Sequence, residues 1–214
     1  MKFKVIIFDQ DGTIANTLPL IAKSIKNSIK ELTNKDLPFD KIVSFFGPSE
    51  DGVLQKMLPE QADKAFAIYL KQYEKMHDEL CPTPFPGIVD LFDALSAKCP
   101  HICLVTGKTW QATNITLQKF GLDEYFEIIE TGSPKGSDKV NGLHRIEKQL
   151  NIDLSDCLYI GDETSDIRRC REAGIPIASV AWAPTALPEK LKQMNPDYMF
   201  YTVEKFKSWI LEHV

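Results

Sequence analysis

The chain has 214 residues, of which 43% are apolar and 26% are charged, so it can form one good-sized domain or a domain with a smaller insert. Its net charge of -5 argues against partners that are nucleic acid or an anionic membrane surface. No apolar run approaches the roughly 20 residues of a membrane-spanning helix, and the first residues make a poor signal peptide. The five scattered cysteines contain no CxxC pair, which indicates reduced thiols and a cytoplasmic protein.

The chain begins with a short apolar run, KVIIF (4–8), which predicts a buried strand. From about residue 18 to residue 73 the apolar residues follow helical spacing, for example at positions 21, 25, 29 and 32, and no convincing strand appears. We therefore expect a helical insert there. The three prolines and the glycine of CPTPFPG (81–87) mark its end.

The remaining chain alternates between strand and helix patterns. We expect strands in HICLVTG (101–107), FEIIETG (126–132), CLYIGDE (157–163) and IPIASVAW (175–182), with helices between them, followed by a short extended piece and a closing helix. This alternation implies crossover connections and a mostly parallel sheet, which makes the fold class α/β.

Polar side chains stand where three of the predicted strands end. They are Asp9 and Asp11 after the first strand, Thr106 and Gly107 after the second, and Asp162 with Asp166 after the fourth. Because ligands bind beyond the carboxyl ends of parallel strands, we expect these residues to share one rim. Carboxylates at close range repel each other, and a hard divalent cation such as Mg²⁺ would offset that repulsion.

A phosphate ester as substrate would explain the remaining features of this rim. One aspartate can attack phosphorus, and a second aspartate two residues away can protonate the leaving alcohol and later deprotonate a water molecule. The metal and the substrate anion would neutralise each other.

The chain resembles the haloacid dehalogenase-like hydrolase superfamily over essentially its whole length, and three motifs carry the resemblance. FDQDGT (8–13) matches its DxDGT signature, LVTG (104–107) its strand-ending Thr or Ser motif, and YIGDETSDI (159–167) its GDxxxD motif. FFGPSED (45–51) is similar to the cap of phosphoglycolate-phosphatase-like members. The resemblance implies a Rossmann-like parallel sheet core, residues 1–14 and 86–214, interrupted by an α-helical cap domain, residues 15–85.

The resemblance also implies a role for each residue of the rim. Asp9 would be the nucleophile, and Asp11 the general acid and base that also gives its backbone carbonyl to Mg²⁺. Thr106, with nearby backbone amides such as that of Gly107, would hold the phosphoryl oxygens. The implied metal site comprises Asp9, Asp11, Asp162 and Asp166, the last supporting the metal directly or through a neighbouring ligand.

The lysine that this family pairs with its nucleophile is ambiguous here, because Lys135 and Lys139 are both candidates in SPKGSDKVNGL (133–143). We favour Lys139, because it stands at the start of a helix whose apolar positions 143, 146 and 150 fall on one face. Lys108 could touch phosphate or face solvent. Phe45, Phe46 and Ser49 could line the substrate pocket, although for the two aromatic residues we favour the core of the cap.

The sequence therefore predicts a Mg²⁺-dependent phosphatase acting on a small phosphorylated metabolite such as a phosphoglycolate-like compound, a nucleotide or a sugar phosphate. Two alternatives stay open. One is phosphoryl transfer within a sugar phosphate, as in β-phosphoglucomutase-like relatives, and the other is a binding protein that keeps the fold without catalysis. The substrate itself is not readable from the cap sequence.

Overall fold

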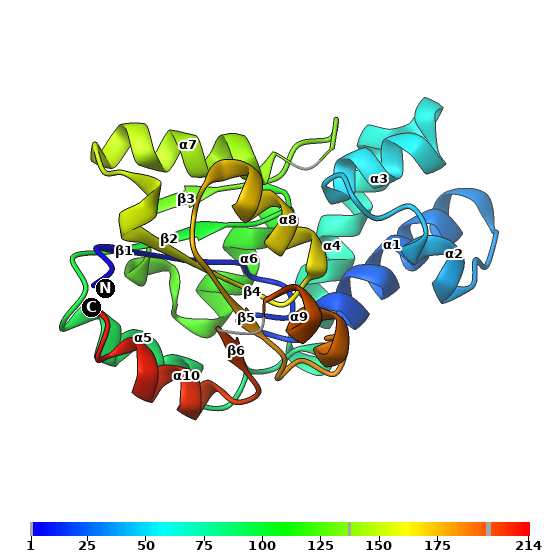
Figure 1. The fold of residues 1–214 in the computed structure, drawn as a ribbon. Coiled ribbons are helices and arrows are strands. Elements are labelled where there is room, and N and C mark those ends of the chain that lie inside the picture. Colours follow the sequence, from blue (N-terminus) through cyan, green and yellow to red (C-terminus); the bar gives the residue numbers. More distant parts are fainter. Residues whose placement is uncertain (1, 137, 196–197) are drawn as a thin grey trace.

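The computed structural model describes residues 2–136, 138–195 and 198–214 and is built around one six-stranded sheet (Figure 1). The strand order is β3-β2-β1-β4-β5-β6, and each neighbouring pair is parallel. The strands are β1 Val5–Phe8, β2 His101–Val105, β3 Ile128–Glu130, β4 Cys157–Gly161, β5 Ile177–Val180 and β6 Met199–Phe200. This arrangement confirms the predicted α/β fold with a Rossmann-like parallel sheet.

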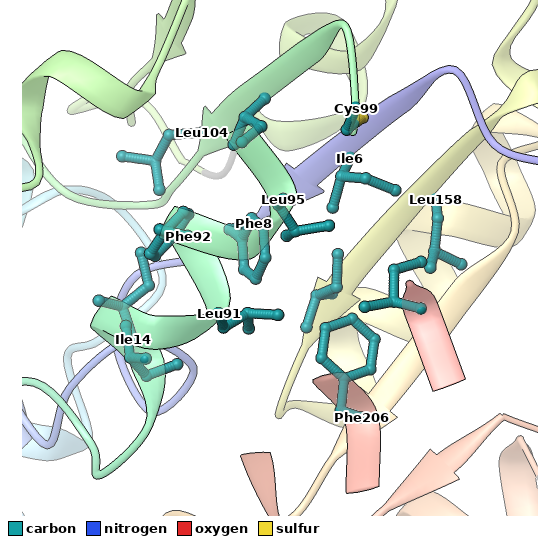
Figure 2. Close-up of a cluster of buried hydrophobic side chains, with 14 of the residues drawn as sticks. Ile6, Phe8, Ile14, Leu91, Phe92, Leu95, Cys99, Leu104, Leu158 and Phe206 are labelled. Atoms are coloured by element: carbon teal, nitrogen blue, oxygen red, sulfur yellow. The ribbon is translucent and has the colours of Figure 1, made fainter. Parts of the chain in front are cut away.

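Helices cover both faces of the sheet, so its central strands are apolar on both sides. Ile6 and Phe8 of β1 point to one face and pack with α5 (Ile88–Ser96) and α10 (Val203–Ile210). Figure 2 shows this cluster, which includes Phe8 and Phe92. The centroids of their rings are 4.8 Å apart. Val5 and Ile7 point to the other face, toward α7 (Lys139–Leu150) and α8 (Thr164–Ala173).

Four of the five α-helices between β1 and β2 fall in the segment for which the sequence predicts a helical insert. They are α1 Leu18–Thr33, α2 Phe39–Val43, α3 Glu50–Met57 and α4 Ala62–Leu80. They share an apolar cluster that also includes Ala112 from beyond β2, and in it Ile21, Ile25 and Ile29 of α1 are buried as their helical spacing predicts. Figure 1 places these helices beyond the carboxyl end of β1, on the side where the rim residues lie. Among the described residues, no helix has both the length and the apolar character that crossing a membrane requires.

Two segments differ from the sequence prediction. The strand predicted for residues 126–132 covers only Ile128–Glu130. It ends early because the chain turns toward the end of β2, where the Gly132 N–H donates to the Lys108 carbonyl at 2.6 Å. Helix α9 (Pro188–Met194) was not predicted. It begins at a proline, which is well suited to the first turn of a helix because that turn has no partner for the missing N–H.

Candidate active site

The turn after β1 brings Asp9 and Asp11 to the rim of the sheet. The Asp9 N–H donates to the Ile160 carbonyl at 2.9 Å, so Asp9 continues the pairing of β1 with β4. The chain then bends through Gly12, whose φ is +75°. A Cβ atom at Gly12 would lie 2.1 Å from Oδ2 of Asp162. Glycine is therefore required both by the backbone conformation and by the close approach of Asp162.

A buried ion-pair cluster lies beside this turn. Nζ of Lys139 is 2.8 Å from Oδ2 of Asp9 and 2.8 Å from Oδ1 of Asp166, and all three side chains are buried. Lys139 is the first residue of α7, whereas Lys135 is exposed in the preceding loop. Of the two candidate lysines, the fold therefore places Lys139 at the rim.

Three of the four acidic residues of the rim form a group that suits a metal ion. Carboxylate oxygens of Asp9, Asp162 and Asp166 lie within 4.8 Å of one another, and all three residues are buried. Burial raises the pKa of Asp9 to about 7, although Lys139 opposes this change, and burial raises the pKa of Asp162 well above its usual range. Ionised together, these carboxylates need more positive charge than Lys139 supplies, and an all-oxygen donor set fits Mg²⁺.

Thr106 and Gly107 end β2 on the same rim. The Thr106 N–H donates to the Glu130 carbonyl at 3.0 Å, so its backbone is held by the sheet. Gly132 packs directly on this turn, since a Cβ atom at Gly132 would lie 1.9 Å from the Gly107 carbonyl oxygen. The turn that carries Thr106 is thereby held by the end of β3 and the residues that follow it.

The alternative that Lys108 faces solvent is wrong, because its side chain is only 2% exposed. Its Nζ donates to the Tyr73 hydroxyl at 2.9 Å and lies 3.4 Å from Oδ1 of Asp11. Burial alone would lower the pKa of Lys108, but Asp11, Tyr73 and Glu50 raise it, so the ammonium stays charged. Lys108 therefore lies between the core and the helical insert and not at the surface.

A cavity of about 150 Å³ joins the rim to the helical insert. Its core side includes Asp9, Asp11 and Lys139, and its insert side includes Phe46 and the loop that follows it. Its wall also contains three charged residues for which the sequence predicts no role, Glu50, Glu163 and Arg169. For Arg169 a signal existed, because it stands three residues after Asp166 and so lies on the same face of α8.

Comparisons with known proteins point to one family. The family model described as haloacid dehalogenase-like hydrolase matches residues 6–180. The chain is 30% identical to the pyrophosphatase PpaX of Listeria monocytogenes over 206 residues, 92% of each chain. It is 29% identical to a phosphoglycolate phosphatase of Thiobacillus denitrificans over 194 residues, 85% of each chain.

Solved structures share the fold as well. A haloacid dehalogenase-like family hydrolase from Streptococcus pneumoniae superposes with a TM-score of 0.76 at 24% identity, covering 97% of this chain and 98% of the other. The family model spans more than half of the chain, and it includes the ends of β1, β2 and β4, with Asp162 and Asp166. The chain therefore belongs to the haloacid dehalogenase-like hydrolase family.

Proposed function

We propose that this protein is a Mg²⁺-dependent phosphatase that hydrolyses a small phosphate compound through an aspartyl-phosphate intermediate. The observation that supports it most is the buried group in which Lys139 pairs with Asp9 and Asp166 beside Asp162, open to a cavity that Asp11 also lines. Phosphoryl transfer needs a nucleophile, a proton carrier, a fixed cation and a set of metal-ligating oxygens.

In the first step, a carboxylate oxygen of Asp9 attacks phosphorus, so an O–P bond forms to Asp9 while the bond from phosphorus to the leaving oxygen breaks. Asp11 gives its proton to the leaving oxygen. In the second step Asp11 takes a proton from a water molecule, whose oxygen attacks phosphorus and releases phosphate and the Asp9 carboxylate. Half-buried Asp11 accepts a hydrogen bond from Thr17, which fixes its position between cavity and turn.

The remaining rim residues would bind and orient the substrate. Lys139 would offset the charge of Asp9 and of the phosphoryl oxygens, which are otherwise repelled by the carboxylate that attacks. The Thr106 hydroxyl and the backbone after it would hold the phosphoryl oxygens. Asp9, Asp162 and the Asp11 carbonyl would hold Mg²⁺, with Asp166 supporting the site. The metal would supply positive charge that offsets the negative charge of the transferred phosphoryl group.

Residues 15–85 act in this proposal as a cap over the rim. Their cavity wall includes Ile21, Ile25 and Phe46, which would exclude water during the attack by Asp9.

All five cysteines are described, buried and without a disulfide, which fits a reducing compartment, and we place the enzyme in the cytoplasm.

We propose that the substrate is short and carries a second acidic group, such as pyrophosphate or phosphoglycolate. The cavity of about 150 Å³ is smaller than the roughly 300–1,000 Å³ of sites for drug-sized ligands, which favours a small substrate over a nucleotide. Arg169 and Lys108 in its wall supply positive charge beyond that of Lys139. The names of the relatives from Listeria monocytogenes and Thiobacillus denitrificans point the same way.

The test is release of inorganic phosphate from a panel of pyrophosphate, phosphoglycolate, hexose phosphates and nucleoside monophosphates, with Mg²⁺ or with a chelator. We expect the highest kcat/KM for one of the first two compounds, no activity with chelator, and a loss of at least ~10³-fold in Asp9→Asn. Conversion of a hexose 1-phosphate to the 6-phosphate without phosphate release would identify a mutase instead. An Asp9→Asn variant that keeps more than a tenth of the activity would exclude Asp9 as the nucleophile.

A further inference from the structure

Glu50 is a cap residue whose carboxylate reaches the core. It is the first residue of α3, and only 4% of it is exposed. Its Oε2 accepts the backbone N–H of Thr109 at 2.7 Å, and its Oε1 accepts the hydroxyl of Tyr69 at 2.9 Å. Tyr69 belongs to α4 of the insert, whereas Thr109 follows the rim residues of β2. One buried carboxylate therefore links the insert to the loop that carries Thr106.

The contact with Thr109 replaces a missing part of a helix cap. Thr109 is the N-cap of α6 (Trp110–Phe120), and its side chain accepts the N–H of Ala112 at 3.4 Å. In a capping box, an acid or amide three residues after the N-cap accepts the N-cap N–H in return. Ala112 occupies that position and has no acceptor in its side chain. Glu50 provides the missing acceptor from another part of the fold.

The same carboxylate lies beside Lys108. Nζ of Lys108 is 3.5 Å from Oε1 of Glu50 and 3.4 Å from Oδ1 of Asp11. Nζ also lies 4.6 Å from the centre of the Tyr73 ring. Among the described residues, Glu50 and Asp11 are the carboxylates within 4 Å of this buried ammonium. Without Glu50, Lys108 would keep Asp11 alone as its close anionic partner.

Two further contacts hold α3 against the core in this arrangement. The Ser49 N–H donates to the Ser133 carbonyl at 3.2 Å. Gly52 packs so closely on the same loop that a Cβ atom there would lie 2.4 Å from the Pro134 carbonyl oxygen. Glu50 thus reaches Thr109 from a helix that is already seated on the core.

We propose that Glu50 is a positioning residue that couples closure of the cap to the order of the loop 106–109 and to the placement of Lys108 beside Asp11. The inference rests on the proposed function in that Asp11 is the acid and base there. When the cap is seated, Glu50 fixes the Thr109 N–H and shares the charge of Lys108. When the cap moves away, the N-terminus of α6 loses an acceptor and Lys108 pairs with Asp11 alone.

The experiment compares Glu50→Ala with Glu60→Ala, an exposed carboxylate of the same insert. Hydrogen exchange of the segment 106–112 is measured without substrate, and kcat and KM are measured on the best substrate of the panel. We expect faster exchange of this segment in Glu50→Ala and a kcat about 10²-fold lower, with KM changed much less, because small misplacements of catalytic groups have costs of this size. Glu60→Ala should match wild type in both measurements.

Glu50→Gln serves if the alanine variant does not fold. Its amide oxygen still accepts the Thr109 N–H, so exchange should stay near wild type, while kcat should fall because the charge next to Lys108 is gone. Adding Lys108→Met to Glu50→Gln should lower kcat less than Lys108→Met does in wild type, since both changes disturb one interaction.

Three results would overturn the inference. The first is unchanged hydrogen exchange of residues 106–112 in Glu50→Ala, and the second is a kcat of Glu50→Ala within twofold of that of Glu60→Ala. The third is a double variant whose loss of kcat equals the product of the losses in the two single variants. If wild type releases phosphate from no substrate, the proposed function fails, and the exchange comparison still decides the coupling between Glu50 and the loop.

Discussion

Lys139 and Asp9 form a buried ion pair between the start of α7 and the end of β1, with Nζ and Oδ2 2.8 Å apart. The same ammonium bonds Asp166, so a single cation separates two carboxylates that would otherwise repel each other. This relationship makes the nucleophile proposed here dependent on a residue that lies 130 positions away in the sequence.

The first prediction distinguishes this lysine from its neighbour in the sequence. Lys139→Ala should lower kcat by at least ~10²-fold, because removing a preorganised electrostatic partner of the transition state has costs of this order. Lys135→Ala should stay within about twofold of wild type, since Lys135 is exposed. Thermal unfolding of both variants shows whether they fold. Equal losses of kcat in the two variants would contradict the role of Lys139 in the site.

The second prediction concerns proton transfer by Asp11. Asp11→Asn should slow hydrolysis of alkyl phosphates by ~10²–10⁴-fold, the usual contribution of general acid–base catalysis. The loss should be smaller for an aryl phosphate, whose leaving oxygen needs no proton. The measurement is kcat on one alkyl and one aryl phosphate in both proteins. The same loss on both would mean that Asp11 only shapes the metal site.

The third prediction uses the contact of Gly52 with Pro134. Gly52→Ala should favour the isolated helix α3 by up to ~1 kcal/mol, yet its new methyl group meets a backbone carbonyl at 2.4 Å. We therefore expect a lower kcat/KM and faster hydrogen exchange of residues 49–53, with little loss of thermal stability. Gln55→Ala, at an exposed position of the same helix, is the control. Matching kcat/KM values for the two variants would contradict a seated cap.

The fourth prediction concerns acid stability. His77 of α4 is fully buried against Thr116 of α6, and burial lowers its pKa from 6.5 to about 4. Between these two values the unfolded chain binds a proton that the folded chain does not, so stability falls as pH is lowered from about 6.5 toward 4. The unfolding temperature should fall with pH more steeply in wild type than in His77→Asn. Gln55→Ala, a change at an exposed position without a titratable group, should leave the slope unchanged.

The rim residues could be predicted from the sequence because they stand at the ends of predicted strands. Asp9, Thr106 and Asp162 each follow an apolar run, and in a parallel sheet all such positions share one edge. Lys139 could be favoured over Lys135 because the apolar periodicity of α7 marks where that helix begins.

Glu50 and Lys108 could not be placed in the same way. Their surroundings depend on how the insert sits on the core, and no periodicity encodes that placement. In sequence, Glu50 resembles any acid in the first turn of a helix, where the helix dipole favours negative charge. Lys108, after a glycine at a strand end, has the appearance of a solvent-exposed residue.

The position of β1 in the middle of the sheet has a consequence for the order of folding during synthesis. Its two neighbours are β2 and β4, and Val5 pairs with both His101 and Cys157. Of the strands in this sheet, β1 is made first, and both of its edges are covered only after β2 and β4 have been made, while α1 and α4 can already pack on each other. A nascent chain stopped before β4 exposes an apolar strand edge that invites aggregation. Asp9 is thus made long before its acidic neighbours Asp162 and Asp166, which follow β4.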